Sequence, residues 1–110
     1  MQYEYFYGAQ AEQFSFYRIP KALFTEPNFR ELSTDAKVLY GILLDRMSLS
    51  LKNQWLDAQN KVYIIFTVEE IMDALNCANQ KATRLMVELE KRAGLIERKR
   101  QGLGRPNLIY

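Results

Sequence analysis

The chain of 110 residues has no histidine, one cysteine and three prolines. The missing histidine removes the usual general base near neutral pH and most metal sites that need an imidazole. The single cysteine, Cys77, excludes an intrachain disulfide and a zinc site of paired cysteines, and it fits a reducing cytosol. The sequence therefore predicts neither a metal site nor a disulfide-stabilised secreted fold.

Long apolar runs are also lacking. No stretch approaches the ~18 apolar residues that a membrane-spanning helix needs, and the start of the chain lacks the pattern of a signal peptide. A phosphate-binding loop of the G-x-x-x-x-G-K-[ST] type is missing, so we expect no cofactor. The acidic cluster of Glu69, Glu70 and Asp73 is more typical of a solvated helix face than of a catalytic set. We expect a cytoplasmic protein that is not an enzyme and does not contact the membrane.

The charges that are present lie unevenly along the chain. A hydrophobic fraction of 48% and a charged fraction of 25% are ordinary for one globular domain. Residues 1–75 hold seven Lys/Arg and ten Asp/Glu (7 − 10 = −3), whereas residues 76–110 hold eight and three (8 − 3 = +5). Such asymmetry indicates a polyanionic partner. The alternative is a solvated cationic face that has no partner.

Aromatic residues are concentrated at the start of the chain. Tyr3, Tyr5 and Tyr7 alternate with other residues, and the alternation resumes at Phe14 and Phe16. This pattern predicts an N-terminal β-hairpin or extended arm over residues 1–20. Because aromatic side chains bury large areas, the arm should pack on its own domain or on a partner subunit.

The middle of the chain predicts a core helix and a strand. Ser33 is a good N-cap, and Asp35 lies where the helix dipole favours a negative charge. Broad apolar stripes then predict a central helix that fades near Leu49. The run VYIIF at 62–66 predicts a buried strand, with which Trp55-Leu56 pairs as a short hairpin.

The last third predicts two helices joined by a short turn. Thr67 and Glu70 form the Thr-x-x-Glu pattern of a capping box. Asn76 stands where the turn needs positive φ, and Cys77 is better read as a small buried hydrophobe than as a reactive thiol. The second helix runs from Asn79 to Arg92; its core-facing residues are Ala82, Leu85, Met86 and Leu89.

A basic hairpin follows the second helix. Gly94 ends the helix as a C-cap, residues 97–101 form a strand, Gly102 and Gly104 allow a tight loop, and a second strand returns to Tyr110. The order of elements predicts an α+β, mostly helical fold: a winged helix-turn-helix with an N-terminal aromatic arm or hairpin. Such a motif places its second helix in a groove of DNA.

The chemistry of the second helix suits that role. The first turns of a recognition helix meet base edges, where amides pair with adenine and cations pair with guanine. No acidic residue occurs from 74 to 87, although an exposed polar face without a partner is the alternative. The predicted recognition-helix residues are Asn79, Gln80, Lys81, Thr83 and Arg84. The predicted wing residues, expected at the DNA backbone or minor groove, are Arg98, Lys99, Arg100, Gln101, Arg105 and Asn107.

The segments FYRIPKALF, LSTDAKVLYGILLDRMSLS and KVYIIFTVEEIMDALNCANQKATRLMVELEKRAGLIERKRQGLGRPNLIY carry a family resemblance. The chain from Phe16 to Tyr110 resembles the RepA-N family, the N-terminal domain of plasmid replication initiator protein A of Gram-positive bacteria, staphylococci included. The resemblance implies a winged helix-turn-helix that binds repeated sites at a plasmid origin. The family often has Ser where this chain has Ala78; the change should cost roughly 1 kcal/mol of capping unless Asn79 substitutes.

We therefore expect a plasmid replication initiator that binds double-stranded DNA at origin repeats. Residues 1–20 form the arm, and residues 21–110 form the DNA-binding domain of a longer protein. The resemblance implies a separate C-terminal domain, which would meet host primosome or helicase-loading proteins. A homodimer or higher self-association is expected. The alternatives are a winged-helix transcriptional repressor and a protein-interaction module of the replication machinery.

Overall fold

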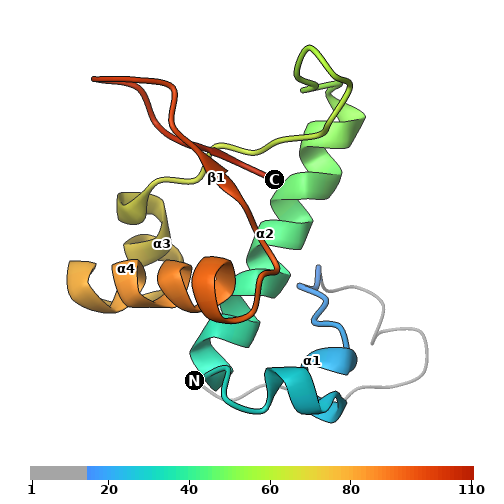
Figure 1. Cartoon of the computed structure of the whole chain (residues 1–110), viewed down its shortest axis with the longest axis vertical. Coiled ribbons are helices and arrows are strands. Elements are labelled where there is room, and N and C mark those ends of the chain that lie inside the picture. Colours follow the sequence, from blue (N-terminus) through green and yellow to red (C-terminus); the bar gives the residue numbers. More distant parts are fainter. Residues whose placement is uncertain (1–14) are drawn as a thin grey trace.

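The computed structural model describes residues 15–110, so most of the predicted arm, from Tyr3 to Phe14, lies outside the described residues. The described part is a mostly helical domain with a small two-stranded antiparallel sheet (Figure 1). Its elements in chain order are α1 (Ala22–Thr25), the 3-10 helix η2 (Pro27–Phe29), α2 (Thr34–Lys52), α3 (Val68–Leu75), α4 (Asn79–Val87), the π-helical turn η3 (Glu88–Arg92), β1 (Arg98–Lys99) and β2 (Leu108–Ile109).

Helix α2 is the longest element, and it begins as predicted. The Ser33 hydroxyl accepts a hydrogen bond from the backbone N–H of Ala36 at 3.1 Å, and Asp35 lies in the first turn. The helix ends at Lys52 rather than near Leu49. One face is buried at Ala36, Leu39, Ile42 and Leu43. This face supports the rest of the domain.

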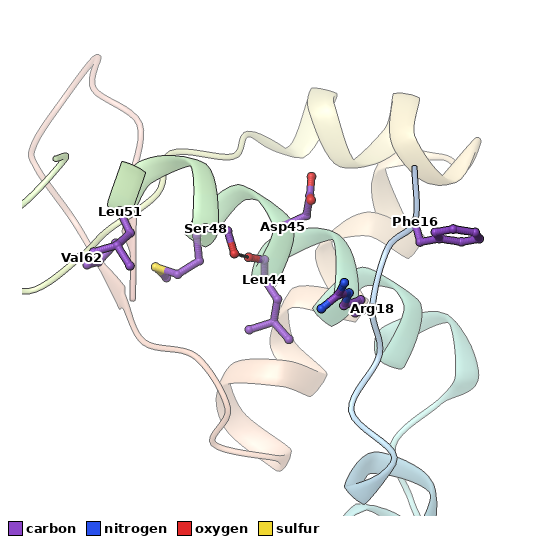
Figure 2. A pocket seen from close by; sticks show the side chains of 9 residues that line it. Phe16, Arg18, Leu44, Asp45, Ser48, Leu51 and Val62 are labelled. Atoms are coloured by element: carbon purple, nitrogen blue, oxygen red, sulfur yellow. Dashed lines mark hydrogen bonds between the residues drawn. The ribbon is translucent and has the colours of Figure 1, made fainter. Parts of the chain in front are cut away.

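Gly41, in the middle of α2, allows the segment that contains Arg18 and Ile19 to cross close over the helix. A Cβ placed on Gly41 would lie 2.9 Å from Cγ1 of Ile19 and 3.1 Å from the backbone oxygen of Arg18. Any larger residue would push this crossing segment away from the helix. Beside the crossing lies a groove of about 610 Å³, lined from α2 by Leu44, Asp45, Ser48 and Leu51 (Figure 2).

The strand predicted at 62–66 is reduced to two isolated bridges. Leu56 pairs with Val62, which gives the predicted short hairpin, and Ile64 pairs with Ile109. The N–H of each residue in the second pair donates to the oxygen of the other at 2.9 Å. Because β2 is only two residues long, it offers few backbone groups to a third strand. The predicted burial is confirmed at Ile64 and Phe66.

The core lies between α2, α3, α4 and the small sheet. The predicted inner face of α4 is confirmed, because Ala82, Leu85, Met86 and Leu89 are all buried. In α3 only Ile71 is fully buried, while Val68, Met72 and Leu75 pack at the margin of the core. The opposite face of α4 is therefore free to face outward.

Candidate nucleic-acid interface

The joint between α3 and α4 follows the sequence prediction closely. The Thr67 hydroxyl accepts from the N–H of Glu70 at 3.2 Å, and the Glu70 carboxylate accepts from the N–H of Thr67 at 3.1 Å. These two bonds complete the capping box. Asn76 ends α3 in the left-handed conformation with φ of 52°, and Cys77 is half-buried against the core. Local chemistry thus fixes where α3 begins and where it ends.

The N-terminal end of α4 has no side-chain cap. Ala78 makes no capping hydrogen bond, and Asn79 does not replace it, because its amide oxygen accepts from the Thr83 hydroxyl at 3.5 Å. Gln80 and Arg84 are exposed on the same helix. With no acidic residue in its first turn, this end presents amides, a hydroxyl and a cation to the outside.

Lys81 is the one predicted recognition-helix residue that forms an ion pair. Its Nζ lies 2.7 Å from Oδ2 of Asp35, at the start of α2. The two side chains are 42% and 53% exposed, and exposed pairs of this kind contribute only about 0.2–1 kcal/mol. A phosphate group can therefore compete with Asp35 for this ammonium group.

The C-terminal end of the same helix is fixed by a buried carboxylate. Glu88 accepts hydrogen bonds from the N–H and the hydroxyl of Ser33, each at 2.9 Å, and is only 7% exposed. The predicted helix does reach Arg92, but its last turn is π-helical, closed by the bond from the N–H of Ala93 to the oxygen of Glu88. Gly94 follows with φ of 65°, as a C-cap requires.

A second carboxylate connects η3 to the hairpin. Oε1 of Glu90 accepts from Nε and Nη2 of Arg98 at 3.0 and 2.8 Å, and Oε2 accepts from the backbone N–H of Arg98 at 3.2 Å. The guanidinium group holds the pKa of Glu90 below its usual range. Arg98 was predicted to contact DNA, but its side chain is 25% exposed and supports the base of the hairpin.

The hairpin itself pairs Arg98 with Ile109 and Lys99 with Leu108. Next to the first pair, on the side away from the loop, Glu97 and Tyr110 exchange backbone hydrogen bonds at 3.2 and 2.9 Å. The strand is shorter than the predicted 97–101 segment. The returning strand is anchored to the 56–62 turn by a side-chain contact.

That contact is a hydrogen bond from the Tyr110 hydroxyl to Oδ2 of Asp57 at 2.8 Å. The other oxygen of Asp57 accepts from the N–H groups of Gln59 and Lys61. The bond from Lys61, followed by that from Tyr110, lowers the pKa of Asp57. The same carboxylate raises the pKa of Tyr110. The last described residue is thus held in place by a specific acceptor.

The end of β1 and the loop that follows it carry three exposed cations. Lys99, Arg100 and Arg105 are exposed. Gln101 was predicted as a polar contact, but its amide nitrogen donates to the oxygen of Pro106 at 2.8 Å and closes the loop. One exposed residue of the loop, Leu103, escaped the sequence prediction, although its position between two glycines was a signal.

A cleft of about 360 Å³ separates the hairpin from the helix pair. Of the predicted residues, it brings together Asn79, Arg98, Arg105 and Asn107. The others lie outside its walls, on the exposed face of α4 or along the hairpin. The loop of the hairpin and the N-terminal end of α4 lie on the same side of the molecule, away from α2 (Figure 1). In the described residues, no acidic or cysteine cluster suits a metal ion.

Comparison with known proteins shows the family of the chain. The family model described as "Replication initiator protein A (RepA) N-terminus" matches residues 15–110. The chain belongs to the RepA N-terminus family. This membership confirms the resemblance seen in the sequence. A "41 kDa protein" of Lactobacillus helveticus is 32% identical over 92 residues, which are 84% of this chain and 26% of that protein. The chain thus spans about a quarter of this relative's length.

Solved structures resemble the chain over nearly its whole length. An "N-Terminal domain of DNA binding protein" is 40% identical with a TM-score of 0.79, covering 99% of this chain and 82% of the other. A "Structure of Rep-DNA complex" is 40% identical with a TM-score of 0.79, covering 97% and 82%. A "Structure of MDR initiator" is 41% identical with a TM-score of 0.76, covering 97% and 84%.

No helix within residues 15–110 has both the length and the apolar character required to cross a bilayer.

Proposed function

We propose that this chain is the sequence-specific, double-stranded-DNA-binding domain of a plasmid replication initiator. The observation that carries the proposal is the likeness, at 40% identity over 97% of the chain, to a protein solved as a Rep-DNA complex. Family membership also supports a binding module rather than an enzyme. On this proposal, the chain marks an origin by occupying repeated sites.

We assign the two exposed surfaces different roles. The α3–turn–α4 pair and the hairpin act as a winged helix-turn-helix, in which the N-terminal half of α4 enters the major groove. Asn79, Gln80, Thr83 and Arg84 are exposed there and have the donors and acceptors that read base edges. On binding DNA, the ammonium group of Lys81 leaves Asp35 and pairs with a phosphate instead.

The hairpin binds the DNA backbone beside the recognition helix. Lys99, Arg100 and Arg105 are exposed cations and serve as phosphate contacts. Asn107 lines the cleft between hairpin and helix pair and assists them. Arg98 and Gln101 act mainly by holding the hairpin in shape, because each already donates within the domain.

The first test finds a target duplex and then measures how the recognition helix and the hairpin each contribute to binding it. The chain is used to select duplexes from a random 30-bp library, and electrophoretic shifts are measured on the selected and on a scrambled duplex at two salt concentrations. Arg84→Ala should lose about 1–3 kcal/mol of binding free energy on the selected duplex and much less on the scrambled one. Arg100→Ala should weaken both and reduce the salt slope by about 1.

Arg30→Ala is the matched control, since Arg30 is exposed beside η2, and its binding should not change. Equal losses for Arg84→Ala and Arg100→Ala on both duplexes would contradict the division of roles. A chain that enriches no sequence would overturn the proposal. Footprinting on the plasmid that carries the coding sequence should show regularly spaced protections; a single protected promoter site would favour a repressor instead.

Self-association and contacts with host primosome or helicase-loading proteins stay predictions. Both concern the first residues of the chain or a region beyond it. Light scattering of the purified chain with and without the selected duplex tests the first prediction directly. A monomer in both conditions would contradict it.

A further inference from the structure

Leu103, in the loop of the hairpin, has an apolar side chain that is fully exposed to solvent. It is 104% exposed, the highest value among the large apolar residues in the described part of the chain. Single exposed apolar side chains are common and need no explanation by themselves. Leu103 differs because the loop that carries it is built to hold it outward.

Two glycines and two hydrogen bonds shape that loop. Gly102 and Gly104, on either side of Leu103, have φ of 118° and 76°, a region that other residues rarely adopt. A Cβ at either glycine would meet no atom within 4 Å, so the glycines serve the backbone conformation and not packing. The Gln101 side chain donates to the oxygen of Pro106 at 2.8 Å, and the N–H of Arg105 donates to the oxygen of Gly102 at 3.3 Å.

Cations surround this apolar tip. Lys99, Arg100 and Arg105 are exposed on both sides of it. No acidic residue occurs from 98 to 110. Glu90 is paired with Arg98 at the base of the hairpin, and Glu69 lines the cleft beside Arg105. An apolar side chain between cations is the composition of minor-groove wedges, in which cations bind the phosphates of both strands and the apolar group enters between two base pairs.

We propose that Leu103 is a wedge that enters the minor groove, opens one base step and bends the duplex. The proposal rests on the proposed function and adds a residue and a mode of binding to it. The hairpin reaches the groove while the N-terminal end of α4 faces the adjacent major groove, because both lie on one side of the molecule (Figure 1). The opened step should be a pyrimidine–purine step, since these steps unstack most easily.

The test measures unstacking and bending apart from affinity. The probe is the duplex selected by the chain, with 2-aminopurine replacing one adenine at a time and with donor and acceptor dyes at its ends. The wild-type chain should raise the 2-aminopurine fluorescence severalfold at one step and shorten the distance between the dyes. Leu103→Ala should lose both signals while its affinity falls by less than about tenfold, because the cations still hold the phosphates.

Two control variants test whether the unstacking and the bending depend on an apolar side chain at position 103. Leu103→Met retains an apolar side chain of similar length and should retain both signals. Leu51→Ala removes another exposed leucine, 61% exposed on α2, and should behave like the wild type. Unstacking that persists in Leu103→Ala would overturn the wedge.

The failure of the wedge can be told from the failure of the proposed function. A wild-type chain that binds the selected duplex tightly but leaves every step stacked and the duplex straight would overturn the wedge alone. A chain that selects no duplex would overturn the proposed function, and the wedge with it.

Discussion

The two ends of α4 and its π-helical extension differ sharply in what their polar side chains do. At the C-terminal end, Glu88 and Glu90 are both engaged within the domain, one with Ser33 and the other with Arg98. At the N-terminal end, Ala78 provides no cap, Asn79, Gln80, Thr83 and Arg84 are exposed, and the one ion pair, from Lys81 to Asp35, is itself solvent-exposed. The difference indicates that one end holds the helix in the fold and the other end is left for a partner.

The largest expected effect tests the buried side of this comparison. Leu89→Ala removes a side chain that is 0% exposed and should lower the free energy of unfolding by about 2–5 kcal/mol. Val87→Ala, at a residue 38% exposed in the same helix, should change it by less than about 1 kcal/mol. Urea denaturation measures both. Similar losses would show that the two faces of the helix are not distinct.

The next effect concerns the carboxylate that joins α4 to α2. Glu88→Gln keeps the volume but replaces a charged acceptor of two hydrogen bonds in a buried site, so the loss should be about 1–3 kcal/mol. Glu97→Gln, at an exposed residue, is the control and should be close to neutral. An unchanged midpoint for Glu88→Gln would mean that the negative charge of Glu88 contributes nothing to the fold.

A change at the opposite end should have the opposite sign. Ala78→Ser supplies the missing N-cap of α4 and should raise the free energy of unfolding by about 0.5–1 kcal/mol. Binding to the selected duplex should be kept, because Ala78 precedes the reading residues. If thermal denaturation shows no gain, the first turn of α4 is satisfied in another way.

The smallest effect is the response to acid. The pKa values of Glu90 and Asp57 are lowered in the folded state by Arg98 and by the N–H of Lys61, respectively. Their contribution is therefore complete above the unfolded value of about 4 and declines as pH falls through the folded values. Denaturation curves at successive pH values should show the decline, and Asp57→Asn should reduce it. Parallel curves for wild type and variant would contradict the assignment.

The sequence predicted the parts of this domain that depend on near neighbours. The capping box of Thr67 and Glu70, the positive φ of Asn76 and the buried face of α4 were all confirmed. Each follows from residues within a few positions of one another, where spacing alone determines geometry.

Contacts between distant residues could not be predicted in this way. The bond between Ser33 and Glu88 joins residues 55 positions apart, and Lys81 meets Asp35 from another helix. The strand at 62–66 was predicted too long because its β-branched run fits any buried extended segment, while pairing depends on the length of its neighbour. The pairing of Arg98 with Glu90 was not predicted either, because the sequence position of Arg98 does not reveal which carboxylate it meets; its contact with DNA stays a prediction.

The fastening of α4 at Ser33 has a consequence for association with DNA. Since Glu88 fixes the far end of the helix to the start of α2, the reading face is already oriented before it meets a duplex. Little conformational freedom is left to lose when it docks, so more of the contact energy appears as affinity. The domain should therefore bind its site as a rigid body, and the conformational change on binding should occur in the nucleic acid.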